Sequence, residues 1–343
     1  MKVTCGLAAI LVGLLVATSC GESTAVSKAA PTPTSPVVPG SLKEFDLPPA
    51  SGSPLDITAG PDGNLWFTEF ALNRIGRITT EGSISVFPLP NEGSYPTTIV
   101  TGPDGDLWFT ELAGNRIGTI TPAGSIREFE LPRLNSGPIS IATGPDKNLW
   151  FTEFSGASPA GTGDVDGNAI GRITPEGVIT EFPLATPGSA PHIITLGPDG
   201  NMWFTETHAG KVGKITPSGR ITEVSLSSRR SDPVGITAGP DGNLWFIEEG
   251  LGRVGRISPA GAITDFATGA TGLFEIIRPG PDGNLWICEV DDNAIARVTT
   301  RGRVSTFVLP RSGSGPIAVV NGPDHKLWLT EFQGDRIGVV VPS

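Results

Sequence analysis

The chain has 343 residues, of which 46 are glycine and 32 are proline, and this content excludes an architecture of long helices. Apolar residues make up 38% and charged residues 17%, which excludes a disordered polyelectrolyte and allows a large core. Asp and Glu number 35 against 24 Lys and Arg, a net charge of -11, so we expect no nucleic acid partner.

The first 20 residues have the pattern of an export signal. Lys2 supplies a positive charge, residues 6–17 form an apolar run, and small residues precede Cys20. The run is too short to span a bilayer as a helix. Small residues directly before a cysteine resemble the bacterial lipoprotein signal, in which the lipidated cysteine becomes the first residue of the mature chain. We therefore predict an exported cell-envelope lipoprotein anchored at Cys20, with an ordinary secreted or periplasmic protein as the alternative.

A linker follows the signal. Residues 21–40 are rich in proline, serine, threonine and alanine and show no apolar period. This composition is typical of an extended tether. We predict that it leads into one domain, residues 41–343, and that the lipid anchor is the only attachment of this domain to a membrane.

The domain is built from seven repeats. A block close to Gly-Pro-Asp-Gly-Asn-Leu-Trp-Phe-Thr-Glu recurs about every 42 residues, with one longer step of 53 between Gly144 and Gly197. The seven tryptophans of the chain all lie in this block: Trp66, Trp108, Trp150, Trp203, Trp245, Trp286 and Trp328. A period near 42 with short strands between turns is typical of a β-propeller.

The first repeat shows the expected strands. Residues 55–59, 65–69, 74–79 and 84–87 are short apolar or alternating runs, and turn residues such as Asp62-Gly63 separate them. Four strands form one blade, and a blade buries both faces only by stacking on neighbours. We predict an all-β, seven-bladed propeller of four-stranded antiparallel blades.

The chain ends predict how the ring closes. The last repeat ends at residues 336–342, a third strand with no fourth after it, while residues 42–47 resemble the fourth strands of other repeats. We predict that residues 42–47 complete the seventh blade.

A glutamate lies three residues after each tryptophan, from Glu69 to Glu331. An acidic ring that binds a cation is one interpretation. Pairing of each glutamate with backbone amides, or with a basic residue such as Arg74 or Arg336, is the favoured one. Residues 164–168 have the spacing of a calcium loop but lack its glycine and final glutamate, so we expect no calcium there.

Residues that depart from the repeat indicate a ligand site. The start of the first strand and the end of the second lie on one face of a propeller, so His192 and His208 are expected at the same mouth. The extra residues of the third repeat, 155–167, are predicted at that mouth too, as a lid or as a surface loop.

The region 42–342 resembles the virginiamycin B lyase family, also called streptogramin lyases. The resemblance rests on the seven GPDGNLWFTE-like blocks, the following NRIGRIT and the closing ITEFPL, as at residues 60–69, 73–79 and 179–184. It implies a seven-bladed propeller. It also implies a Mg2+-dependent C–O lyase that opens a cyclic depsipeptide at its ester by elimination, which requires a base and a cation or acid.

The family site has a Pro-His in one blade and a Glu-Pro-His in the next, followed by a glutamate four residues after a tryptophan. By this resemblance His192 contacts substrate, and Asp232 and Glu249 hold Mg2+. Val234 occupies the position of the catalytic histidine, which makes His208 the candidate base. Aligned by repeat order instead, the two histidine positions are Glu275 and Ile317 and the match disappears.

Two functions remain open. The first is an exported lyase of this family that acts on a cyclic ester. The second, slightly favoured because the usual base is missing, is a non-catalytic, surface-tethered propeller. It would bind a small molecule, peptide, glycan or protein at the mouth that carries the histidines. We expect a monomer in either case.

Overall fold

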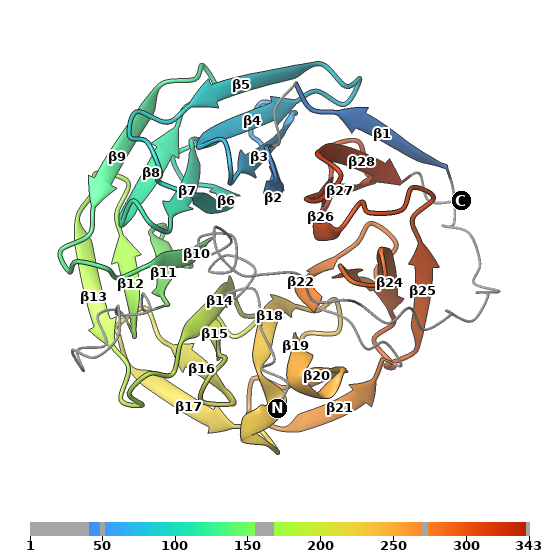
Figure 1. Ribbon diagram of the computed structural model, residues 1–343. Coiled ribbons are helices and arrows are strands. Elements are labelled where there is room, and N and C mark those ends of the chain that lie inside the picture. The colour runs from blue at the N-terminus through green and yellow to red at the C-terminus, as the bar shows by residue number, and fades with distance from the viewer. Residues whose placement is uncertain (1–40, 49–51, 155–167, 269–273, 341–343) are drawn as a thin grey trace, which may run out of the picture.

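The computed structural model describes residues 41–48, 52–154, 168–268 and 274–340, which form a ring of seven four-stranded antiparallel sheets (Figure 1). The predicted seven-bladed propeller is confirmed. The predictions for the signal, for lipidation at Cys20, for the tether 21–40 and for the insertion 155–167 lie outside the described residues. The described residues include no helix with the length and hydropathy of a membrane span.

Each blade runs from an inner strand at the axis to an outer strand at the rim, and we number the blades from β2 onwards. Blade one contains β2 (Pro54–Ala59), β3 (Leu65–Glu69), β4 (Arg74–Ile78) and β5 (Ile84–Pro88). Blade two contains β6 (Pro96–Thr101), β7 (Leu107–Glu111), β8 (Arg116–Ile120) and β9 (Ile126–Glu130). Blade three contains β10 (Pro138–Thr143), β11 (Leu149–Glu153), β12 (Ala169–Ile173) and β13 (Ile179–Pro183).

The remaining blades repeat this order. Blade four contains β14 (Pro191–Leu196), β15 (Met202–Glu206), β16 (Lys211–Ile215) and β17 (Ile221–Ser225). Blade five contains β18 (Pro233–Ala238), β19 (Leu244–Glu248), β20 (Arg253–Ile257) and β21 (Ile263–Ala267), with short 3-10 helices η1 (Arg229–Ser231) and η2 (Glu249–Leu251) beside it. Blade six contains β22 (Phe274–Pro279), β23 (Leu285–Glu289), β24 (Ala294–Val298) and β25 (Val304–Val308). Blade seven contains β26 (Pro316–Asn321), β27 (Leu327–Glu331), β28 (Arg336–Val340) and β1 (Leu42–Asp46).

The tight turn between the first two strands is stabilised by its own aspartate. In blade one, Asp62 Oδ1 accepts a hydrogen bond from Trp66 Nε1 at 3.0 Å and from the Asn64 backbone N–H at 3.2 Å. Gly63 has a φ of 76°, a left-handed conformation that glycine adopts without strain. The repeated block is thus a hairpin turn that also fixes the tryptophan ring, and its recurrence gives every blade the same shape.

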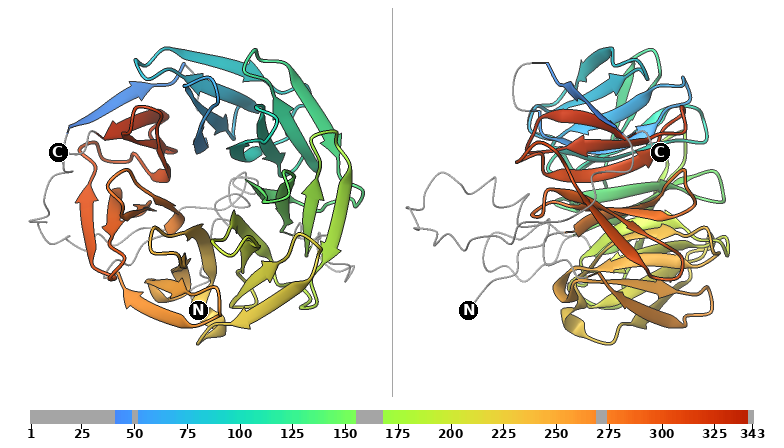
Figure 2. Two further views of the ribbon diagram at one scale, coloured as in Figure 1. Left: turned by 180° about the vertical axis from the view of Figure 1, so that it is seen from behind. Right: turned by 90° about the vertical axis from the view of Figure 1, so that its right-hand side faces the viewer.

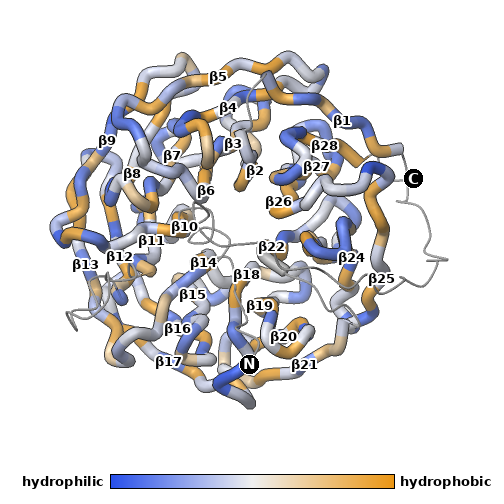
Figure 3. Tube along the Cα trace, viewed as in Figure 1, coloured by the Kyte–Doolittle hydropathy of each residue, from blue (hydrophilic) through white to orange (hydrophobic). Residues whose placement is uncertain are grey.

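Aromatic stacking fills the space between blades. Trp66 stacks on Phe87 with ring centroids 5.3 Å apart, and the Arg77 guanidinium lies over both rings. The same tryptophan–phenylalanine stack recurs in blades two, three, five, six and seven. Figure 3 shows the alternation of apolar and hydrophilic segments within each blade, and the view from behind in Figure 2 shows the blades side by side in one ring.

In most blades, a threonine of the second strand forms a hydrogen bond with the backbone of the next blade. In blade three, Thr152 Oγ1 donates to the His192 backbone carbonyl of blade four at 2.6 Å, while it accepts from the Ser140 N–H of its own blade. The corresponding donors and acceptors are Thr68 to Thr97, Thr110 to Ile139, Thr205 to Val234 and Thr330 to Leu55.

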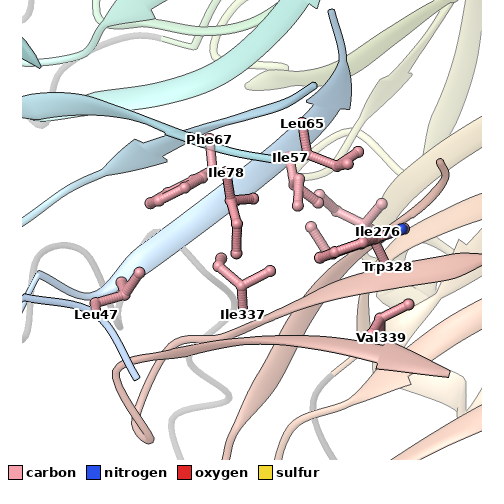
Figure 4. Packing of buried hydrophobic residues seen from close by; sticks show 10 residues of the cluster. Leu47, Ile57, Leu65, Phe67, Ile78, Ile276, Trp328, Ile337 and Val339 are labelled. Atoms are coloured by element: carbon pink, nitrogen blue, oxygen red, sulfur yellow. The ribbon is translucent and has the colours of Figure 1, made fainter. Parts of the chain in front are cut away.

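The ring closes as predicted. β1 pairs antiparallel with β28, from Leu42 opposite Val340 to Asp46 opposite Arg336, and Figure 1 shows β1 at the rim beside β28. Phe45 stacks on Trp328 with centroids 5.8 Å apart. Figure 4 shows the core at this junction, in which Leu47 joins residues of blades one, six and seven.

The seven glutamates are buried at the ends of the second strands. Glu69 and Glu331 form the predicted ion pairs, with Arg74 at 2.7 Å and Arg336 at 2.8 Å. In blades two, four and five the basic residue instead pairs with a carboxylate of the outer strand: Arg116 with Glu130, Lys211 with Glu223 and Arg253 with Asp265. The expected pairing therefore holds in blades one and seven only, among the residues that the structure describes.

Four of these glutamates make stability depend on pH. Burial, with a neighbouring carboxylate charge, raises the pKa of Glu111, Glu153, Glu206 and Glu289 from 4.5 to about 7. The folded chain then binds more protons than the unfolded chain between these two values, so the free energy of unfolding decreases as pH rises through this window and levels off above it. We expect melting temperatures at constant ionic strength to fall from pH 5 to pH 8, and less steeply in Glu153→Gln. A melting temperature that rises over this range would contradict the assignment.

Candidate functional site

The mouth is the face of the propeller where inner strands begin and second strands end, as the pairing of Pro191 with Glu206 shows. The structure brings His192 and His208 together there, next to the same aromatic ring. The Phe154 ring centroid lies 5.6 Å from that of His192 and 6.1 Å from that of His208. The two histidines and Phe154 thus line one site between blades three and four.

His192 is buried, with 2% of its surface exposed. Burial, with the nearby charge of His208, lowers the pKa of His192 to about 4, so its imidazole is neutral at pH 7. Neither ring nitrogen has a hydrogen-bond partner among the described residues. The backbone is fixed on both sides, since Thr152 donates to the His192 carbonyl and the Ile193 N–H donates to Thr205 Oγ1 at 3.2 Å. His192 is therefore a preorganised side chain whose polar atoms are left for a ligand.

Most of the mouth is apolar. A cluster of Leu55, Phe70, Ile139, Val290 and Ile317 lies around the channel entrance, with Tyr95, Leu112, Phe154 and Phe332 packed against it. The residue after each buried glutamate contributes Phe70, Leu112, Phe154, Val290 and Phe332 to this cluster, but it is Thr207 in blade four and Glu249 in blade five. We call His192, Thr207, His208, Asp232 and Glu249 the polar sector.

Two carboxylates of the polar sector interact. The Glu249 backbone N–H donates to the Asp232 carbonyl at 3.3 Å. Burial, followed by the charges of Asp232 and Asp291, raises the pKa of Glu249 to about 7, and Glu249 Oε1 is buried without a hydrogen-bond partner among the described residues. Burial also raises the pKa of Asp232, and the charge of His208 opposes that rise. The site therefore holds carboxylates that a cation would stabilise.

Backbone geometry around these carboxylates is tight but not unusual for this chain. A Cβ on Gly250 would lie 2.2 Å from the Arg230 carbonyl oxygen and 2.6 Å from Asp232 Oδ2, so glycine is required there. Asp232 has a φ of 44°, in the left-handed region. The residues before the inner-strand prolines of other blades share this conformation: Ser53, Tyr95, Gly137, Ala190 and Gly315. The conformation of Asp232 is thus a feature of the repeat.

The sequence profile of the virginiamycin B lyase family matches residues 36–161, 162–271 and 268–343, which together cover most of the chain. The chain belongs to this family.

Solved structures agree with this result. The virginiamycin B lyase from Staphylococcus aureus is similar at 36% identity and a TM-score of 0.81, over 88% of this chain and 99% of that one. A structure described as a streptogramin B lyase is similar at 32% identity and a TM-score of 0.81, over 88% of this chain and 98% of that one. A third, at 36% identity and a TM-score of 0.81 over 88% of this chain and 99% of that one, is a catalytically inactive histidine-to-alanine variant of the S. aureus enzyme with quinupristin. No curated protein sequence matches the chain at a significant level.

Aligned with the Glu-Pro-His of the virginiamycin B lyase family, this chain has a valine, Val234, where that motif has its histidine. Val234 is 1% exposed and packs in a core cluster with Trp245 and Ile247. Its side chain is apolar and holds no proton-accepting atom. The candidate base of this virginiamycin B lyase relative is therefore His208, which is exposed and whose charge acts on the pKa values of both Asp232 and His192.

The polar sector fits Mg2+ in the type of donor it offers. Mg2+ prefers oxygen ligands and is usually held by one or two carboxylates, with water or substrate completing its octahedron. Asp232 and Glu249 supply two such carboxylates, and the unpaired Glu249 Oε1 is an available ligand atom. No group of three or more His, Cys, Asp or Glu side chains gathers around a common point in the described residues.

Sequence reasoning missed two residues near this site. Phe154 contacts both histidines, and Asp291 contributes to the raised pKa of Glu249 from blade six. The signal for Phe154 is its place directly after Glu153, where the repeat has apolar residues around the mouth. Asp291 follows Val290 at the same mouth, so the register of the repeat also locates it.

Proposed function

We propose that this propeller is a Mg2+-assisted C–O lyase that opens a cyclic ester by elimination at the polar sector. The observation that carries the proposal is the interruption of an apolar mouth by two histidines and two carboxylates in adjacent blades. An apolar rim suits a cyclic peptide substrate with aromatic or aliphatic side chains. In this proposal the base, the substrate contact and the cation ligands all come from the polar sector.

Each residue has a separate part in the elimination. The His208 imidazole accepts the proton from the carbon beside a carbonyl, a double bond forms, and the ester C–O bond breaks so that the carboxylate leaves with the electron pair. The neutral His192 orients the substrate. When bound by Asp232 and Glu249, Mg2+ supplies positive charge near the oxygen on which negative charge develops. The Phe154 ring, which contacts both imidazoles, adds an apolar surface beside them.

Incubation of residues 21–343 with a type B streptogramin and Mg2+ tests the proposal, with products followed by chromatography and fragmentation mass spectrometry. We expect a linear product of unchanged mass, because elimination adds no water, and we expect a chelator to abolish its formation. A product heavier by one water would indicate hydrolysis. Antibiotic that stays intact at high protein concentration would exclude the lyase activity on this substrate.

A second candidate function rests on one observation, the buried Val234 in place of the family's base. Without that base, the same mouth would act as a binding site for a peptide, glycan or small cyclic molecule. Saturable binding of intact streptogramin, measured by calorimetry without turnover and weakened in His192→Ala, would favour this function over the lyase.

A further inference from the structure

A cavity lies in the central channel, at the end opposite the mouth. Its volume is about 350 Å3, and it is lined by residues from the second half of the inner strands, among them Thr58, Thr195 and Arg278. Figure 1 shows these inner strands arranged around the axis. We call this cavity the far chamber. Its lining residues include no member of the polar sector, so it is a separate space.

Arg278 is the exceptional residue of the far chamber. It is paired with Trp286 in the strand register, and the equivalent residues pair with the other six tryptophans. Those six described residues are uncharged: Thr58, Val100, Ala142, Thr195, Thr237 and Val320. The repeat therefore places a single guanidinium at a position where the other blades present small or β-branched side chains.

The guanidinium of Arg278 is only partly satisfied. Its Nη2 lies 3.7 Å from Asp56 Oδ1, which is too long for a hydrogen bond, and no hydrogen bond joins it to the residues that the structure describes. Asp56 is bound elsewhere, since its Oδ2 accepts from the Ile99 N–H at 3.1 Å. The Arg278 side chain is 23% exposed and that of Asp56 is 2% exposed. Most of the five N–H donors of Arg278 are therefore available to the far chamber.

We propose that the far chamber binds a small oxyanion, a carboxylate or a phosphate, at Arg278. A planar guanidinium binds both groups through paired hydrogen bonds. The hydroxyls of Thr101 and Thr143 already donate to backbone carbonyls, at 2.7 and 2.8 Å, so Thr58 and Thr195 are the hydroxyl donors left for the ligand. The cavity volume is at the lower end of that of small-molecule sites, which suits a ligand of few heavy atoms.

Asp56 sets the affinity of this site. Its carboxylate attracts the same guanidinium from blade one, across the inner strand of blade seven, and repels an incoming anion. The ion pair and the ligand therefore compete for Arg278. Removal of the Asp56 charge has the opposite effect on binding from removal of the Arg278 charge. General attraction of anions would respond to the two charges with the same signs, so a specific site is recognised by comparison with an arginine outside the chamber.

Isothermal titration with inorganic phosphate and with acetate, at an ionic strength fixed with sodium chloride, tests the proposal. We expect Arg278→Gln to weaken binding by about tenfold or more, because a charge-assisted hydrogen bond contributes roughly that factor. We expect Asp56→Asn to tighten binding several-fold. Arg297→Gln is the matched control, since Arg297 also lies 3.7 Å from an aspartate carboxylate, Asp282, but outside the chamber.

The outcomes are distinct. Binding of both probes supports the oxyanion class, and binding of one alone assigns the ligand to that source. Equal affinities in wild type and Arg278→Gln, or no binding in either wild type or Asp56→Asn, would overturn the proposal. If Arg278→Gln does not fold, the Asp56→Asn variant tests the proposal alone. An affinity of Asp56→Asn for phosphate or acetate that is equal to or weaker than that of wild type would contradict competition between Asp56 and the ligand for Arg278.

Discussion

Substitution of Glu249 by glutamine is expected to lower kcat/KM for ring opening by about a hundredfold or more, because in the proposed mechanism it removes a carboxylate that would hold the charge-stabilising cation. The change is almost isosteric. It also removes an acid whose pKa burial and the charges of Asp232 and Asp291 raise from 4.5 to about 7. Relative to wild type, the variant should therefore gain stability as pH rises between these two values and keep that gain at higher pH. Steady-state kinetics over a Mg2+ titration, with thermal melts at pH 6 and pH 8, measure both effects.

Glu153→Gln is the matched control for this variant. Glu153 is a buried glutamate at the same mouth, burial and the Glu181 charge raise its pKa to about 7, and it lies outside the polar sector. Its substitution should produce the same change in the melts and leave kcat/KM unaltered. Glu249→Asp, which keeps the charge, should retain activity at a higher Mg2+ concentration. Full activity of Glu249→Gln would remove Glu249 from the metal site.

Removal of the closing strand should have the largest effect on stability. A chain that begins at residue 49 loses β1 and Leu47, and with them the Phe45–Trp328 stack and the Arg311–Glu44 ion pair at 2.9 Å. Burial of Leu47, together with the partial burial of Phe45 and Leu42, contributes roughly 3–6 kcal/mol. Since 1 kcal/mol shifts the melting temperature of a domain of this size class by about 2–4 °C, we expect a decrease of about 10 °C or more.

The comparison needs a chain that starts at residue 41, so that only the strand differs between the two proteins. Circular dichroism melts of both give the change in melting temperature. Addition of a synthetic peptide of residues 41–48 should restore part of the loss, because the exposed edge of β28 is its template. Identical melting temperatures for the two chains would show that closure of the ring does not depend on β1.

Much of this fold could be predicted because its signals are local and repeated. Seven tryptophans in closely similar blocks fix the number of blades, and an unfinished last repeat identifies residues 42–47 as the missing strand. Strand order alone also places His192 and His208 at one mouth, since the starts of inner strands and the ends of second strands alternate in a fixed way.

The partners of side chains could not be predicted in the same way. Arg116 stands opposite Glu111 on one neighbouring strand and Glu130 on the other, and the register alone does not decide between them. Arg74 has a proline, Pro88, on its outer side, which leaves Glu69 as its acidic partner in the register. The contact of Arg278 with Asp56 joins blades six and one across blade seven, so no local sequence pattern predicts it.

Closure by β1 also bears on how such a ring changes its number of blades during evolution. A sequence repeat and a structural blade coincide in blades one to six, but the seventh blade takes its outer strand from the start of the chain. Duplication or deletion of a whole internal repeat therefore preserves the junction between β1 and β28. Loss of the final repeat would instead leave β1 without the strand that it pairs with, β28. The number of repeats can therefore change in the middle of the gene more readily than at its end.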